Sequence, residues 1–142
     1  MDTVEKLATE TRLLRTAARN WRTSSARRAG KLGRILAGMP TIDEVVVHME
    51  HIRSIHGLCC AYCTAPVNFT TKKHRMNLDH ALPVSRGGDA SLSNLVVSCG
   101  PCNRAKGEMT QVEFKELRLA VVGWQDHGRM LFIRLRMGYF GR

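Results

Sequence analysis

The chain has 142 residues, which suits one domain with a single core. Its 22 lysines and arginines outnumber 12 acidic residues and give a formal net charge of +10, which favours a polyanionic partner such as nucleic acid. The sequence contains neither an apolar run long enough to span a bilayer nor a cleavable signal pattern. We therefore expect a soluble protein that does not use a membrane as its partner.

The first predicted element is an amphipathic helix over residues 3–20. Apolar or small residues recur every three or four positions, from Val4 and Leu7 to Ala18 and Trp21, and arginines fall mostly on the other faces. Glycines at 30, 33 and 38 and a proline at 40 then loosen the pattern. We expect Trp21 to be a core residue, with stacking on a nucleic-acid base as the alternative.

Two capping boxes predict further helices. The segment from Thr41 to Glu44 opens a helix that runs to about Arg53 and stops at Gly57, and the segment from Thr110 to Glu113 opens one that ends near residue 122. Between them, residues 76–78 and 95–98 are candidate strands, joined by an irregular loop over residues 81–93. The final stretch, residues 129–142, alternates basic and apolar residues and is expected to form a strand or a short helix.

Five cysteines include two Cys-x-x-Cys pairs, formed by Cys60 with Cys63 and by Cys99 with Cys102. Two such pairs supply the four thiolates that a tetrahedral structural Zn²⁺ site needs. Buried or redox-active cysteines are the alternative reading, and Cys59 could replace Cys60 as a ligand. Metal-binding thiols imply a reducing compartment.

Between the pairs lies "LDHALPVSRGGDASLSNLVVSCGPCNRAKG", which resembles the HNH endonuclease family over about residues 57–107. The resemblance implies an α+β fold: a small ββα-metal (His-Me finger) core stapled by a four-cysteine zinc site and flanked by N-terminal and C-terminal helices. The family's motif positions correspond to Asp79, His80, Asn94 and Asn103. The resemblance also implies DNA as the partner, the cytoplasm of a bacterial cell or phage-infected host as the location, and Mg²⁺ or Mn²⁺ as the catalytic ion.

These residue types suit phosphodiester hydrolysis. His80 titrates near neutral pH and can accept a proton from water, and Asp79 and Asn103 offer the oxygen ligands that a hard divalent ion prefers. Adjacent residues on a strand point to opposite faces, so we expect the strand to end or kink at Asp79 and His80 if both approach one phosphate. Asn94 is expected to brace the loop by hydrogen bonds. A strand-end cap and a buried structural histidine are the alternative roles for Asp79 and His80.

Basic side chains could hold DNA phosphates without reading bases. Around the expected site these are Lys72, Lys73, Arg75, Arg86, Arg104 and Lys106, and in the N-terminal segment they are Arg12, Arg15, Arg19, Arg22, Arg27 and Arg28. Any one of them could instead belong to a solvated charged face.

The sequence therefore predicts a basic helical region at residues 1–56, an HNH nuclease core at 57–109, and a C-terminal helix and tail at 110–142 that pack on the core. The predicted function is endonucleolytic hydrolysis of DNA, by nicking or double-strand cleavage, with one divalent ion and a histidine general base. Cleavage of both strands would need a homodimer or two sequential nicks. A non-catalytic, zinc-stabilised nucleic-acid-binding module is the main alternative, and an RNA-directed protein is a third.

Overall fold

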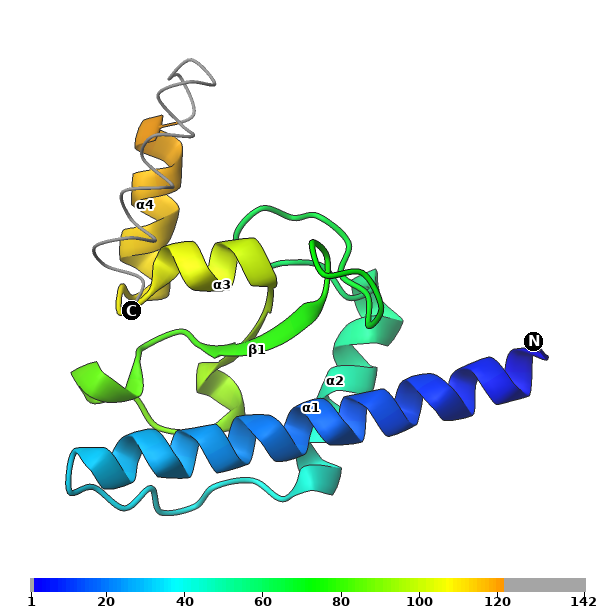
Figure 1. Cartoon of the computed structure of the whole chain (residues 1–142), viewed down its shortest axis with the longest axis horizontal. Helices are drawn as coiled ribbons and strands as arrows, with labels where there is room; N and C mark the ends of the chain where they lie inside the picture. Colours follow the sequence, from blue (N-terminus) through cyan, green and yellow to red (C-terminus); the bar gives the residue numbers. More distant parts are fainter. Residues whose placement is uncertain (1, 122–142) are drawn as a thin grey trace.

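The computed structural model describes residues 2–121 (Figure 1). Its elements, in chain order, are α1 (Thr3–Lys31), α2 (Ile42–His56), β1 (Met76–His80), β2 (Leu95–Cys99), α3 (Gly100–Lys106) and α4 (Gln111–Val121). Together with a cluster of cysteines, these helices and the two-stranded sheet confirm the predicted α+β class. The expected strand or helix at residues 129–142 lies outside the described residues. None of the helices within residues 2–121 is both long and apolar enough to cross a bilayer.

Helix α1 continues well past the predicted boundary at residue 20 and ends at Lys31. The added turns contain alanine, arginine and serine but no glycine or proline before Gly30, so nothing in them interrupts the helix. The buried stripe also continues through Trp21, Ser25 and Ala29 at the same three- or four-residue spacing. Gly33 follows the helix with a φ of 68°, a left-handed conformation that glycine adopts without strain.

Helix α2 begins with the predicted capping box. The Thr41 hydroxyl accepts a hydrogen bond from the Glu44 amide at 3.2 Å, and the Glu44 carboxylate accepts one from the Thr41 amide at 2.7 Å. Gly57 ends the helix with a φ of 74°, as expected. Val45 and Met49 bury one face of α2 in the same core as Leu14 of α1, and the ion pair between Arg53 and Glu10 spans 2.9 Å at the edge.

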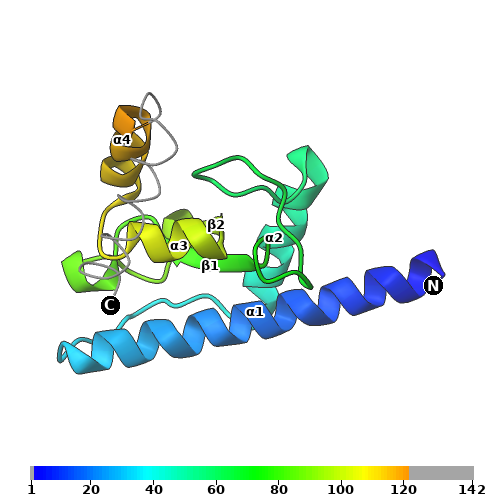
Figure 2. The same ribbon diagram turned by 45° about the horizontal axis from the view of Figure 1, so that its top comes forward.

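Strands β1 and β2 form an antiparallel hairpin in which His80 pairs with Leu95 and Asp79 with Val96. Both strands are slightly longer than predicted. Figure 2 shows the hairpin between α1 on one side and α3 on the other. The side facing α1 and α2 belongs to the helical core, which we define by its buried residues Leu14, Ala18, Trp21, Val45, Val46, Met49, Met76, Ala90, Leu95 and Val97. The opposite side faces the cysteine-side core, defined by Cys60, Tyr62, Cys99, Cys102, Ala105 and Phe114.

The loop between the strands is held against the segment that follows α1. The Arg34 guanidinium donates to the backbone carbonyls of Val84 at 2.6 Å and Gly88 at 3.3 Å. A side chain at Gly88 would place its Cβ only 1.8 Å from the Leu82 carbonyl oxygen, so the loop closes tightly only with glycine at this position. The loop after β1 is therefore held both by Arg34 and by its own tight turn at Gly88.

Helix α4 also starts with the predicted capping box, in which Thr110 and Glu113 exchange hydrogen bonds at 2.9 and 3.2 Å. Its buried residue is Phe114, whose ring meets the Tyr62 ring edge-on with centroids 5.1 Å apart. This contact attaches α4 to the cysteine-side core.

Candidate metal centre and active site

The predicted cysteine pairs converge. The sulfur atoms of Cys60, Cys63, Cys99 and Cys102 all lie within 4.8 Å of one another. Cys60 and Cys63 come from the tight turn before β1, while Cys99 ends β2 and Cys102 lies in the first turn of α3. Cys59 lies outside this group. The cluster thus joins one turn, one strand end and one helix start, which are far apart in the sequence.

The geometry and chemistry of this cluster fit Zn²⁺. A tetrahedral ion with Zn–S bonds of about 2.3 Å separates its sulfur ligands by about 3.8 Å, and the Cys63 and Cys99 sulfur atoms are 3.8 Å apart. The Cys102 thiol lowers the pKa of the Cys60 thiol by hydrogen bonding to it, whereas the same interaction raises the pKa of Cys102. A bound cation would replace the proton between two such neighbouring thiols and stabilise both thiolates.

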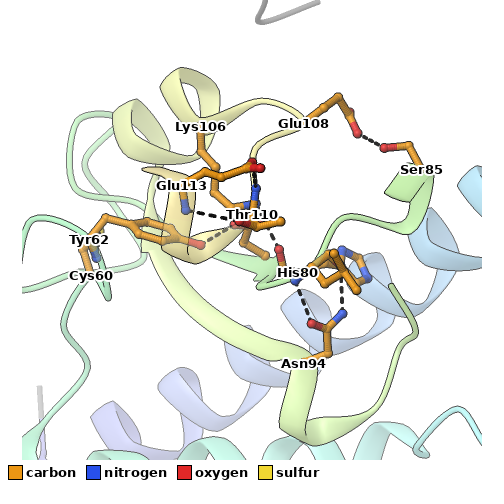
Figure 3. A network of polar contacts seen from close by, with 11 residues as sticks. Cys60, Tyr62, His80, Ser85, Asn94, Lys106, Glu108, Thr110 and Glu113 are labelled. Atoms are coloured by element: carbon orange, nitrogen blue, oxygen red, sulfur yellow. Dashed lines mark hydrogen bonds and ion pairs between the residues drawn. The ribbon is translucent and has the colours of Figure 1, made fainter. Parts of the chain in front are cut away.

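Asp79 lies on the face of the hairpin directed at the cysteine-side core. Its carboxylate accepts a hydrogen bond from the Tyr62 hydroxyl at 2.8 Å and forms an ion pair with the Lys106 ammonium at 3.2 Å (Figure 3). The Lys106 side chain is 1% exposed and also donates to the His80 carbonyl at 3.0 Å. Burial raises the pKa of the Tyr62 hydroxyl, and the nearby Asp79 charge adds to the effect. Tyr62 therefore stays a hydrogen-bond donor to Asp79.

His80 lies on the other face, against α1. Its ring stacks on the Trp21 indole with centroids 5.2 Å apart and an angle of 23°, and its Nε2 lies 2.8 Å from the Ser25 hydroxyl oxygen. Burial lowers the pKa of His80 to about 4, and the positive charges of Arg28 and Lys106 act in the same direction while Asp79 opposes them. The imidazole is therefore neutral at neutral pH, which is the state a general base requires.

Strand β1 ends at His80, as the sequence predicts for a site that uses both residues. The two side chains make their contacts on opposite faces of the hairpin, yet both line one cavity of about 190 Å³. Three cationic side chains, those of Arg28, Lys31 and Lys106, line the same cavity. The carboxylates of Asp79 and Glu108, a neutral imidazole and three cations thus line one space.

Asn103 lines a different cavity, of about 660 Å³, between α1 and the start of β1. This larger cavity also contains Arg27, Arg75 and Asn77, and Arg28 lines both cavities. The pair of oxygen ligands expected from the sequence for a hard divalent ion is therefore divided between adjoining cavities. Of the two, Asp79 is the one that lies with His80.

Asn94 braces the loop, the role that the sequence predicts for it. Its amide oxygen accepts from the Leu82 amide at 2.8 Å, and its amide nitrogen donates to the Leu82 carbonyl at 3.0 Å (Figure 3). The amide nitrogen also donates to the Asp89 carbonyl at 2.8 Å. These bonds fix the chain directly after His80. Asn94 thus acts on the shape of the site through the loop backbone.

The basic residues expected at a DNA interface have different surroundings. Arg15 is paired with Asp43 and Arg86 with Glu113, while Lys106 is buried beside Asp79. Arg22 is partly buried. The remaining members of the set are exposed: Arg12, Arg19, Arg27, Arg28, Lys72, Lys73, Arg75 and Arg104.

Several residues at the site have no sequence signal that identifies them. Ser25 and Trp21 contact His80 from more than fifty positions away, and Tyr62 reaches Asp79 from the turn between two cysteines. The stripe of small and apolar residues on α1 predicts that Trp21 is buried, but it does not predict which side chain it meets. The sequence shows Lys106 as part of a basic set, but it does not show that Lys106 is buried.

Comparison with known proteins finds a family match in the central part of the chain. Residues 60–108 match the family model described as HNH endonuclease, which confirms the resemblance seen in the sequence. The match contains the four clustered cysteines as well as Asp79, His80, Asn94 and Asn103. No curated protein and no solved structure matches the chain.

Proposed function

We propose, from the premise that residues 60–108 form an HNH endonuclease domain, that this protein hydrolyses phosphodiester bonds in DNA. The observation that carries the proposal is the cavity lined by Asp79 and His80 together with Arg28, Lys31 and Lys106. The exposed side chains of Arg28 and Lys31 can attract a phosphate toward this space, whereas Lys106 is buried and paired with Asp79.

In the proposed reaction, neutral His80 accepts a proton from a water molecule. The water oxygen forms a bond to phosphorus, the bond from phosphorus to the leaving sugar oxygen breaks, and solvent returns a proton to that oxygen. Asp79, which lies in the cavity with His80, would hold the Mg²⁺ or Mn²⁺ ion that the family resemblance implies. The second ligand expected from the sequence, Asn103, lines the adjoining cavity. Such an ion neutralises charge on the phosphate and on the leaving oxygen. Lys106 and Tyr62 orient the Asp79 carboxylate by their contacts with it.

The DNA backbone is proposed to follow α1. The larger cavity carries Arg27, Arg28 and Arg75 and adjoins the cavity of His80, so neighbouring phosphates of one strand can be held in sequence. If about six phosphates are contacted, affinity should fall by at least ~10³ between 50 and 200 mM salt. Replacing exposed Arg27 with alanine should reduce this salt dependence, whereas Arg12→Ala tests whether the contacts continue toward the start of α1.

The decisive experiment is cleavage of supercoiled plasmid DNA with Mg²⁺ or Mn²⁺ by the wild-type protein, His80→Ala and His80→Gln. Loss of the general base should slow cleavage by roughly 10²- to 10⁴-fold in both variants. Because His80 is buried, both must first show wild-type zinc content and circular dichroism. His51→Ala, an exposed position on α2, is the matched control and should cleave at the wild-type rate. Equal rates for wild type and both His80 variants would exclude this catalytic role.

One observation favours the alternative of a zinc-stabilised nucleic-acid-binding module without catalysis. His80 is 2% exposed, and the Lys106 ammonium already neutralises Asp79. The same assay separates the two functions: a protein that retards plasmid DNA in a gel without cutting it under any divalent ion is a binding module.

A further inference from the structure

His80 has a buried hydroxyl partner that comes from outside the matched domain. Its Nε2 lies 2.8 Å from the Ser25 oxygen, and the two residues are 55 positions apart in the sequence. Ser25 is 0% exposed and lies on α1, one turn after the Trp21 indole that stacks on the imidazole. The family match at residues 60–108 does not include either α1 residue.

The second contact of Ser25 determines what its hydroxyl can do for His80. The Ser25 oxygen is also 2.7 Å from the backbone carbonyl oxygen of Trp21. A carbonyl oxygen only accepts hydrogen bonds, and a serine hydroxyl has one proton. Two oxygen atoms at this distance repel each other unless that proton lies between them, so the Ser25 proton is directed to Trp21. The Ser25 oxygen therefore presents a lone pair to His80.

A lone pair on Ser25 requires a proton on His80 Nε2. In a neutral imidazole one ring nitrogen carries the proton and the other carries the accepting lone pair. With the proton on Nε2, the basic nitrogen is Nδ1. Within residues 2–121, Nε2 is the ring nitrogen of His80 for which a hydrogen bond is found.

We propose that Ser25 is a positioning residue: it holds His80 in the Nε2–H tautomer, so that Nδ1 is the atom that takes the proton from the attacking water. Trp21 fixes the plane of the ring by stacking, and Ser25 fixes its protonated edge. In the step itself an O–H bond of water breaks and an Nδ1–H bond forms, which leaves an imidazolium whose Nε2–H still donates to Ser25. The catalytic part of this inference rests on the proposed nuclease function, whereas the tautomer does not.

Ser24 supplies a matched control. Its hydroxyl donates to the same Trp21 carbonyl, at 3.1 Å, whereas the hydroxyl that meets His80 is that of Ser25. Ser24→Ala and Ser25→Ala therefore each remove a hydrogen bond from a serine hydroxyl to the Trp21 carbonyl. Of the two, only Ser25→Ala also removes the oxygen that meets His80 Nε2.

The tautomer is measured by long-range ¹H–¹⁵N correlation NMR on zinc-loaded, full-length protein labelled with ¹⁵N-histidine, near neutral pH and without DNA. The His80 signals are identified by their loss in His80→Gln. We expect a protonated Nε2 and an unprotonated Nδ1 in the wild type and in Ser24→Ala, and a mixture of tautomers in Ser25→Ala. A wild-type protein with its proton on Nδ1 overturns the inference, whether or not any variant folds.

Plasmid cleavage then tests the consequence for catalysis. Removing a residue that orients a catalytic group commonly costs about 10- to 100-fold, so Ser25→Ala should lower kcat by that factor with little change in KM. Ser24→Ala should keep the wild-type kcat. A Ser25→Ala variant that has lost the tautomer preference but keeps wild-type kcat overturns the positioning role. A wild type that never cleaves DNA counts against the nuclease function, and the NMR spectrum still decides the tautomer.

Discussion

The two faces of the β1–β2 hairpin are stabilised by different means. On the face toward α1 and α2, Met76 and Val97 are buried in the helical core, an apolar packing to which Leu14, Trp21 and Val45 belong. On the opposite face, four sulfur atoms form the centre of a smaller cluster with Tyr62 and Phe114. His80 belongs to the first face and Asp79 to the second. The candidate site therefore exists only while both kinds of stabilisation hold the same strand.

The largest effect is expected on the cysteine side. Cys102→Ser removes one ligand, and because zinc binding contributes on the order of 10 kcal/mol to small structural sites, this variant should lose its zinc and the cooperative unfolding of residues 60–108. Native mass spectrometry measures the zinc, and hydrogen exchange measures the local unfolding. Cys59→Ser changes the neighbouring cysteine outside the cluster and should keep both zinc and protection. Identical exchange in the two variants would show that metal does not hold this face.

The helical face depends on Trp21, which is 3% exposed. Trp21→Ala should lower the free energy of unfolding by about 3–5 kcal/mol, because it removes a large buried side chain and leaves a cavity. Trp21→Phe keeps an aromatic ring and should lose less. Urea denaturation measures both. A loss below about 1 kcal/mol for the alanine variant would mean that apolar packing is not what holds this side.

The link between the faces is tested at the buried ion pair of Lys106 and Asp79. Lys106→Met leaves the Asp79 carboxylate buried without its cation and should cost about 3 kcal/mol. Tyr62→Phe removes a neutral donor from the same carboxylate and should cost about 1 kcal/mol. Chemical denaturation of the two zinc-loaded variants gives the comparison. A larger loss of stability in Tyr62→Phe than in Lys106→Met would show that the charge of Lys106 is not the main partner of the Asp79 carboxylate.

The smallest effect concerns pH. The pKa of His80 is lowered from 6.5 to about 4 in the folded protein, mainly by burial. Between pH 6.5 and about 4 the unfolded chain therefore binds a proton at His80 that the folded protein does not bind. The free energy of unfolding is consequently unaffected by this group above pH 6.5 and decreases as the pH falls toward 4. The loss should be roughly 1 to 3 kcal/mol. Denaturation curves across this pH range give the free energy of unfolding of the wild type and of His80→Gln. A difference between the two proteins that does not change with pH would contradict this prediction.

Local chemistry accounts for what the sequence could predict. Both capping boxes, the glycine that ends α2 and the convergence of the Cys-x-x-Cys pairs depend on residues close in sequence or on ligand rules that do not need a fold. The end of β1 at His80 was likewise expected, from the condition that both residues of the candidate site approach one phosphate.

Tertiary contacts account for what it could not predict. Ser25 reads as an ordinary small residue within a helix, and nothing near it in the sequence indicates a histidine 55 positions later. Lys106 looks like one more surface cation until the fold places it beside Asp79. The division of Asp79 and Asn103 between two cavities depends on where α1 crosses the hairpin, and that crossing follows from side-chain packing rather than from any motif.

Helix α1 is continuous over its 29 residues. At a rise of 1.5 Å per residue it measures about 43 Å, which is the length of about 13 base pairs of duplex DNA. Ser25 and Trp21 attach this helix to the imidazole. Under the proposed function, its cationic side chains would therefore stand at fixed distances from the scissile bond, and a contact between Arg12 and the duplex would determine where the strand is cut.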